Sequence, residues 1–238
     1  MVMLETVHLY SGYGKLKVLF DINFKAREKE ITVVVGPNGA GKTTLMNSIC
    51  GIATIHKGKV VFEGKEITGM PTHKVARLGI AYLPQMGNVF AELTVEENLK
   101  IAGYLLPKDE VKDRIDEVLD IFPKLRAFLH RKAGTLSGGE RRMLAISMAL
   151  MRRPKILLLD EMTTDLAPIL VKKVLEKVVE LRDRLGLTIV LVEQHAKRAL
   201  EIGDRAYLLV SGTMRFEGDP RELLEHPEFA KLYLGITK

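Results

Sequence analysis

The stretch that decides the fold is ITVVVGPNGAGKTTLMNSIC, residues 31–50. Its first five residues are mostly apolar, as in a buried strand, and TTLMNSIC at 43–50 has a helical pattern. Between them, GPNGAGKT at 36–43 fits G-x-x-x-x-G-K-S/T. The glycines let consecutive backbone N–H groups converge on a phosphate, Lys42 reaches the β- and γ-phosphate oxygens, and Thr43 can hold Mg²⁺. The stretch therefore predicts a nucleotide site.

A second apolar strand ends in two carboxylates, in ILLLDE at 156–161. Packing gives no reason for this ending, because each carboxylate must be solvated or paired. In a protein with such a phosphate loop, the first carboxylate lies beside the loop and holds Mg²⁺, and here it is Asp160. Glu161, one step further, is predicted to face the γ-phosphate and to polarise a water.

The stretch LSGGERR at 136–142 places a serine and two glycines at the start of a predicted helix. A helix N-terminus offers unpaired N–H groups and a partial positive charge to an anion. The chain thus has two anion-binding helix starts, and the second has no lysine of its own.

The order of elements predicts an α/β fold. Apolar strands near 31–35, 156–160, 188–193 and 206–210 alternate with helical segments near 43–50, 168–185 and 195–202. Such alternation is typical of a parallel sheet covered by helices on both faces. Extended stretches at 2–10 and 17–25 flank a glycine-rich turn and, with 59–63, predict a small antiparallel sheet. Residues 88–153 lack strand signals and predict an inserted set of helices near 94–105, 109–121 and 138–151, separated at Pro107 and Pro123.

Composition describes an ordinary globular protein of 238 residues, with 47% apolar and 28% charged residues. The longest apolar runs are strand-sized and far too short to span a bilayer, and no secretory leader is recognisable. Cys50 is the single cysteine, which excludes an internal disulfide, suits a reducing cytoplasm and is interpreted as a packing residue. The net charge of +6 comes without a basic run interleaved with aromatics, so nucleic acid is not an expected partner.

Taken in order, the motifs resemble those of the ATP-binding cassette (ABC) ATPases over essentially the whole chain. They are Tyr13 in YG, the phosphate loop, Gln85 in YLPQ, LSGGE at 136–140, Asp160–Glu161, and His195 in VEQH. The resemblance implies one domain with a RecA-like P-loop NTPase core at 1–87 and 154–238. The core would include the antiparallel β subdomain, and 88–153 would be a helical subdomain carrying LSGGE.

The resemblance also implies a role for each matching residue, with ATP and Mg²⁺ as the bound groups. Glu161 would be the general base, assisted by Lys42, Gln85 and His195. Mg²⁺ would be held by Thr43, Gln85 and Asp160. ATP would be contacted by Tyr13, Val18, Asn38, Gly39, Ala40, Gly41, Lys42, Thr43 and Thr44, and by Ser137, Gly138 and Gly139 acting on the nucleotide of a second chain.

The implied partners are a second ABC ATPase chain, identical or different, and separate membrane permease subunits. A substrate-binding protein would be an indirect partner, and the chain would lie peripherally on the cytoplasmic face of the membrane. A groove near 86–105 would receive the permeases. Phrases such as RLGIAYLPQ and the terminal YLG are similar to ATPase subunits of branched-chain amino acid importers.

Three alternatives stay open at this point. YLPQ, GGERR and YLG are also similar to the ATPase of lipopolysaccharide export, so a lipid exporter is the alternative transporter. A nucleic-acid-associated ABC ATPase is more distant, because the phosphate loop and LSGGE enclose no sustained heptads. A P-loop kinase would leave LSGGE and His195 unexplained.

The chain departs from the family pattern after two motifs. Met162 stands where proline is usual, Asp165 where glycine or alanine is usual, and Ala167 where aspartate is frequent. The pair Arg141–Arg142 follows LSGGE where glutamines are common, and the sequence assigns it no role.

Overall fold

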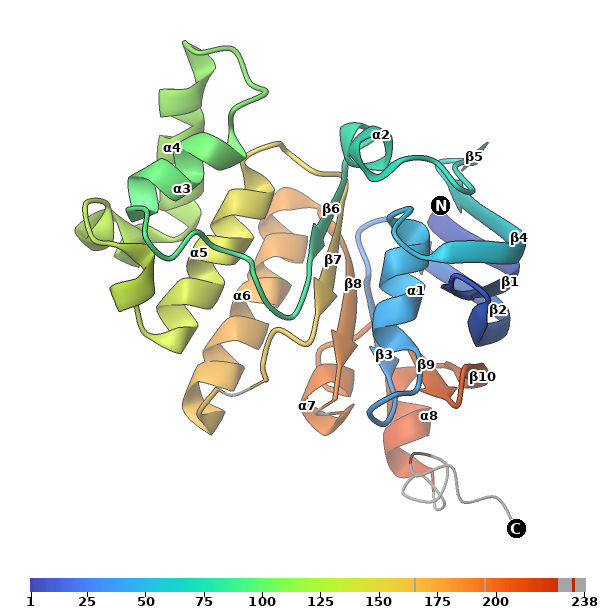
Figure 1. The fold of residues 1–238 in the computed structure, drawn as a ribbon. Coiled ribbons are helices and arrows are strands. Elements are labelled where there is room, and N and C mark those ends of the chain that lie inside the picture. Colours follow the sequence, from blue (N-terminus) through green and yellow to red (C-terminus); the bar gives the residue numbers. More distant parts are fainter. Residues whose placement is uncertain (165, 195, 227–232, 234–238) are drawn as a thin grey trace.

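The computed structural model of this protein describes residues 1–164, 166–194, 196–226 and 233. It contains two sheets with helices between and beside them (Figure 1). Within the described residues no helix combines the length and hydropathy needed to cross a membrane.

The larger sheet has six strands in the order β10-β9-β3-β8-β7-β6. The five strands from β9 to β6 pair in parallel, whereas β10 is antiparallel to β9. The strands are β3 (Ile31–Val35), β6 (Ile80–Leu83), β7 (Ile156–Asp160), β8 (Thr188–Glu193), β9 (Arg205–Val210) and β10 (Thr213–Gly218). The predicted parallel α/β core is confirmed, and its strands deliver their carboxyl ends to one edge.

Side chains of the central strand β3 alternate between two cores. Ile31, Val33 and Val35 join the core beneath α5 (Gly138–Leu150), α6 (Pro168–Leu185) and α7 (Ala196–Leu200). Val34 points the other way, into the core that includes α1 (Lys42–Ile49) and the smaller sheet. Burial on both faces explains why all five residues of β3 are fully covered.

The smaller sheet is antiparallel, in the order β2-β1-β4-β5. Its strands are β1 (Val2–Tyr13), β2 (Leu16–Arg27), β4 (Thr54–Phe62) and β5 (Lys65–Glu66). Alternate side chains of β2 are buried against α1, while the intervening ones face outward. This sheet places the β1–β2 turn beside the phosphate loop.

The helical insert contains α3 (Val95–Ala102), α4 (Glu110–Ile121) and α5, with short 3₁₀ segments at Pro123–Phe128 and Ala133–Thr135. The predicted helices are thus present. Both α3 and α5 begin with a capping box, Thr94 with Glu97 and Ser137 with Glu140.

Besides the two-residue β5 and the 3₁₀ segments, four short elements were not expected from the sequence: β6, β10, α2 (Thr72–Arg77) and α8 (Pro220–Glu225). Each has six residues or fewer and a mixed burial pattern, so none has a periodicity long enough to recognise.

Candidate functional site

The phosphate loop joins β3 to α1 at the edge where the parallel strands end (Figure 1). Gly39 and Gly41 have φ angles of 75° and 105°, which L side chains rarely adopt. A Cβ at Gly36 would lie 2.0 Å from the carbonyl oxygen of Leu209. Of the other predicted contacts in the loop, Asn38 and Thr43 are exposed, whereas Ala40 and Thr44 are buried.

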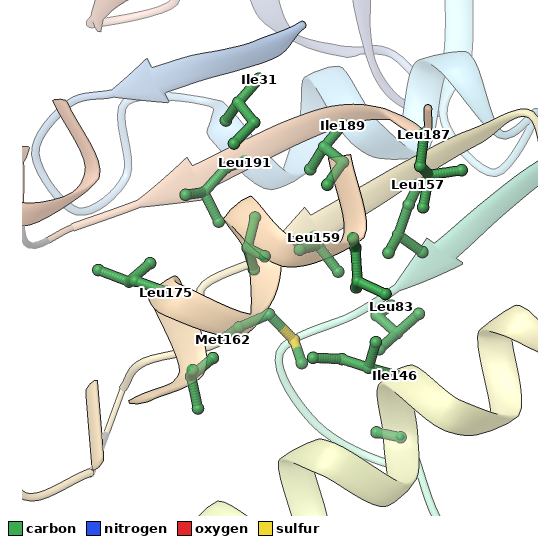
Figure 2. Close-up of a cluster of buried hydrophobic side chains, with 14 of the residues drawn as sticks. Ile31, Leu83, Ile146, Leu157, Leu159, Met162, Leu175, Leu187, Ile189 and Leu191 are labelled. Atoms are coloured by element: carbon green, nitrogen blue, oxygen red, sulfur yellow. The ribbon is translucent and has the colours of Figure 1, made fainter. Parts of the chain in front are cut away.

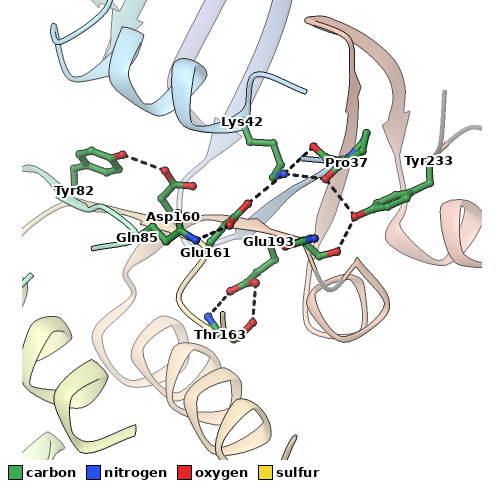
Figure 3. A network of polar contacts seen from close by, with 11 residues as sticks. Pro37, Lys42, Tyr82, Gln85, Asp160, Glu161, Thr163, Glu193 and Tyr233 are labelled. Atoms are coloured by element: carbon green, nitrogen blue, oxygen red, sulfur yellow. Dashed lines mark hydrogen bonds and ion pairs between the residues drawn. The ribbon is translucent and has the colours of Figure 1, made fainter. Parts of the chain in front are cut away.

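Lys42 folds back over this loop and reaches Glu161 (Figure 3). Its Nζ donates to the carbonyl oxygens of Gly36 at 2.9 Å and Pro37 at 3.1 Å, and lies 3.3 Å from Glu161 Oε1. The Lys42 side chain is only 4% exposed. A buried ammonium group is tolerated here because carbonyl and carboxylate oxygens surround it.

Asp160 ends β7 and is fully buried. Its Oδ2 accepts a hydrogen bond from the Tyr82 hydroxyl at 3.1 Å, whereas Oδ1 has no partner among the described residues. Burial raises the pKa of Asp160, and the neighbouring Thr43 and Tyr82 hydroxyls oppose that rise. An unpaired buried carboxylate oxygen close to a threonine hydroxyl fits the oxygen ligands that Mg²⁺ takes when phosphates complete its shell.

Gln85 follows β6 and points at the same carboxylate as Lys42 (Figure 3). Its Nε2 donates to Glu161 Oε2 at 3.1 Å. One Glu161 oxygen therefore faces Lys42 and the other faces Gln85.

Glu161 has an unusual main chain, with a φ angle of 49°. This left-handed conformation costs a non-glycine residue about 1–3 kcal/mol. The Glu161 N–H donates to the Val192 carbonyl oxygen at 2.8 Å, which holds the turn against β8. The chain thus leaves the sheet immediately after Asp160.

Glu193 is a site residue that sequence reasoning missed. It ends β8, is 1% exposed, and accepts bonds from the Thr163 N–H at 3.0 Å and the Thr163 hydroxyl at 2.7 Å (Figure 3). Burial raises the pKa of Glu193 to about 7, against the opposing effect of the two Thr163 bonds. The available signal was the one used for Asp160, a carboxylate at the end of a buried strand.

Tyr233 was also missed as an individual site residue. Its hydroxyl lies 2.8 Å from the Gln194 carbonyl oxygen and 3.2 Å from that of Gly36 (Figure 3). Tyr233 thereby bridges the phosphate loop and the segment after β8. His195, the predicted γ-phosphate contact, and Asp165 lie outside the described residues.

Tyr13 and Val18, the predicted ATP contacts outside the phosphate loop, lie on β1 and β2 of the smaller sheet. Tyr13 is 44% exposed, and its hydroxyl accepts a hydrogen bond from Asn47 Nδ2 at 2.8 Å. A Cβ on Gly41 would lie 3.5 Å from Val18 Cγ1.

Ser137 caps α5 away from this cluster. Its Oγ accepts from the Glu140 N–H at 3.4 Å, and a hydroxyl in that role can still donate its hydrogen. Ser137 and Gly138 are exposed, whereas Gly139 is buried. In Figure 1 the start of α5 and the phosphate loop are separated by α6 and strands of the larger sheet. The structure does not bring the two predicted anion-binding helix starts together within one chain.

Met162 and the pair Arg141–Arg142, which depart from the family pattern, make defined contacts in the structure. Met162 is fully buried and packs in the cluster with Leu83, Ile146 and Leu159 (Figure 2). Arg141 and Arg142 both donate to main-chain carbonyl oxygens, and Arg142 reaches the carbonyl oxygen of Gln85 in the site.

Comparison with known proteins places these features in a family. A family model described as ABC transporter matches residues 19–164. LivF of Archaeoglobus fulgidus, named as a probable branched-chain amino acid transport ATP-binding protein, is 58% identical, covering 99% of this chain and 100% of the relative. BraG of Pseudomonas aeruginosa, named as a high-affinity branched-chain amino acid transport ATP-binding protein, is 42% identical, covering 99% of this chain and 100% of the relative. LptB of Escherichia coli, named for lipopolysaccharide export, is 32% identical over 99% of this chain and 98% of its own.

Solved structures agree with this assignment. An ATP-binding cassette of an ABC transporter in its ADP conformation has a TM-score of 0.89 and 29% identity, with 99% of each chain covered. A nucleotide-free cassette has a TM-score of 0.88 and 29% identity, with 100% of each chain covered. The chain therefore belongs to the ABC transporter family, as an ATP-binding cassette that hydrolyses ATP.

Proposed function

We propose that the chain powers an importer of branched-chain amino acids, with Glu161 as the hydrolytic base. The observation that carries the hydrolytic assignment is the position of Glu161, between Lys42 at 3.3 Å and Gln85 at 3.1 Å. The transported substrate is supported by the 58% and 42% identical relatives, whose names specify branched-chain amino acid transport.

In this proposal the nucleotide lies along the loop that precedes α1. Tyr13 stacks on adenine beside Val18, and the N–H groups of Asn38, Gly39, Ala40, Gly41, Lys42, Thr43 and Thr44 surround the phosphates. Phosphate oxygens compete with Glu161 for the Lys42 ammonium group, so nucleotide binding frees the carboxylate. Glu161 then takes a proton from the attacking water while Lys42 stabilises the developing negative charge.

Gln85 and His195 are the remaining residues proposed to act beside the γ-phosphate. Gln85 positions the attacking water from the side opposite Lys42, and His195, outside the described residues, contacts the γ-phosphate. The products are ADP and phosphate.

Thr43, Asp160 and Gln85 are the proposed Mg²⁺ ligands. The unpaired buried Oδ1 of Asp160 supports this choice. The ion would neutralise phosphate charge, and the hydroxyl of Tyr82 would orient the Asp160 carboxylate through its 3.1 Å bond.

Ser137, Gly138 and Gly139 are proposed to bind the γ-phosphate held by a second chain, identical or different. The start of α5 lies away from the phosphate loop of its own chain, which supports a role in trans (Figure 1). The exposed Ser137 hydroxyl and the helix dipole supply the donors and positive potential that a lysine supplies in the first site.

Separate membrane permease subunits are proposed to bind near residues 86–105. A groove of about 400 Å³ lies there and is lined by Tyr82, Phe90, Met148 and Arg152 among others. The Met86 and Phe90 side chains are 80% and 52% exposed, which is unusual for large apolar groups. We further propose that 88–153 acts as a helical subdomain, that a substrate-binding protein delivers the amino acid, and that the chain lies on the cytoplasmic face.

Replacing Glu161 with Gln tests the hydrolytic proposal. We expect kcat to fall at least about 100-fold, because the amide cannot accept the proton, while the Kd for ATP changes less than about threefold. The variant should also accumulate an ATP-dependent dimer in size-exclusion chromatography. Wild-type turnover in Glu161→Gln would contradict the assignment.

The substrate is tested separately, with permease subunits reconstituted in proteoliposomes. A branched-chain amino acid with its binding protein should stimulate ATP hydrolysis by the wild-type complex and leave Glu161→Gln inactive. Stimulation by lipopolysaccharide would support the exporter instead, and stimulation by DNA would overturn the transport proposal.

A further inference from the structure

Arg142 reaches out of α5 to the segment that carries Gln85. Its Nη1 donates to the Gln85 carbonyl oxygen at 2.8 Å, between residues 57 positions apart. The Arg142 side chain is half-buried, and a charge-assisted bond in such a setting is stronger than one between neutral groups. This contact ties the Gln85 main chain to α5.

The preceding arginine makes different contacts. Arg141 Nη2 donates to the carbonyl oxygens of Gly134 and Leu136, both at 3.2 Å. These bonds hold the approach to α5 rather than the Gln85 segment. Arg141 is therefore a matched comparison, with the same charge on the same helix.

The segment after Gln85 has a second anchor at its far end. Asn98 accepts from the Phe90 N–H at 2.8 Å and donates to the Phe90 carbonyl oxygen at 3.0 Å. Between these anchors, Met86 and Gly87 are exposed, and Gly87 has a φ angle of 72°. At the Gln85 end, beyond the last β6 pair at Leu83, the Arg142 bond holds the main chain.

We propose that Arg142 is a positioning residue for hydrolysis, which keeps the Gln85 side chain on Glu161. The inference rests on the proposed roles of Gln85 and Glu161. Gln85 receives the Arg142 bond on its main chain and donates from its side chain to Glu161 Oε2 at 3.1 Å. Loss of the first bond lets the Gln85 amide move away from the carboxylate.

The contact also connects the start of α5 with the Gln85 side chain beside Glu161. Ser137 caps the N-terminus of the helix that contains Arg142. A shift of this helix relative to the core therefore moves Gln85 together with the start of α5, where the γ-phosphate of a second chain is proposed to bind. Arg142 thus couples binding of the partner's γ-phosphate to the geometry around Glu161.

Steady-state ATP hydrolysis by four variants tests this coupling. They are Arg142→Ala, Arg142→Lys, Gln85→Ala and the Arg142→Ala/Gln85→Ala double variant. We expect Arg142→Ala to lower kcat about tenfold, with KM for ATP within about twofold, since the contact supports a hydrolytic group. Arg142→Lys should recover part of the loss, because lysine keeps one charged donor. In the Gln85→Ala background, Arg142→Ala should lower kcat less than about twofold further. A second tenfold loss in that background would overturn the proposal.

Amide hydrogen exchange over residues 84–91 tests the same contact without requiring activity. Exchange should be at least about threefold faster in Arg142→Ala than in the wild type, and unchanged in Arg141→Ala. Unchanged exchange in Arg142→Ala would contradict the proposed anchoring. Wild-type turnover in Gln85→Ala would instead refute the role given to Gln85 under the proposed function, and the exchange result would still decide whether Arg142 holds the segment.

Discussion

Replacing Glu193 with Gln should change how the stability of the protein depends on pH. Glu193 is 1% exposed and bound to Thr163 through both carboxylate oxygens. In Glu193→Gln the amide oxygen can accept from the Thr163 N–H, and the NH₂ group can donate to the Thr163 hydroxyl. The substitution thus keeps the shape and the two contacts while removing the titration.

The magnitude follows from the pKa of the buried carboxyl. Burial raises the pKa of Glu193 from 4.5 to about 7, and each pKa unit corresponds to about 1.4 kcal/mol. Because the folded state binds the proton more tightly, this contribution is fully present below pH 4.5 and is lost as the pH rises through 7. Between pH 5 and 8, the wild type should lose about 2–3 kcal/mol of unfolding free energy relative to Glu193→Gln.

Urea unfolding of both proteins at half-unit steps from pH 5 to 8 measures this difference. Groups distant from Glu193 affect both proteins alike, so the difference between the two curves reports on the Glu193 site. The wild-type curve should fall towards high pH relative to the variant. Parallel curves would refute the reasoning, because they would show that folding leaves the Glu193 pKa near its ordinary value.

Two further substitutions test the packing and the adenine pocket. Met162→Ala should lower the unfolding free energy by about 2–5 kcal/mol in denaturant titrations, because a fully buried side chain leaves a cavity, whereas Met162→Leu should cost less than about 1.5 kcal/mol. Equal effects of Ala and Leu would contradict that packing role. Tyr13→Ala should raise the Kd for ATP about tenfold, since base stacking on an aromatic ring is lost, and Tyr13→Phe should remain within about threefold. Fluorescent nucleotide titrations measure both, and an unchanged Kd in Tyr13→Ala would place adenine elsewhere.

Local sequence patterns predicted the long elements of this fold. The mostly apolar five-residue run of β3 and the helical pattern of α6 are visible because burial restricts the residue type at every position of a buried strand and once per turn of a half-buried helix. β6 has only four residues, and β10 alternates between half-buried and exposed positions at the sheet edge. Such short elements are specified by their neighbours in space, which a linear pattern does not contain.

The same distinction between local pattern and spatial neighbours applies to the residues of the site. Lys42, Asp160 and Glu161 were predictable because each lies in a motif whose chemistry needs that residue type. The bonds from Tyr82 to Asp160, Arg142 to Gln85 and Tyr233 to Gln194 join residues 78, 57 and 39 positions apart. Only the folded chain reveals these pairs. Burial of Glu193, which raises its pKa, is likewise a property of the packed structure.

A mixing experiment tests the two-chain active site most directly. Lys42→Ala disables the phosphate loop and Ser137→Arg blocks the start of α5, so each variant alone should have little ATPase activity. In a mixed dimer, one site combines both defects while the other pairs an intact loop with an intact α5 start. Random mixing of equal amounts should therefore restore about a quarter of wild-type turnover. Activity of the mixture no greater than that of the separate variants would contradict a site completed by a second copy of the chain.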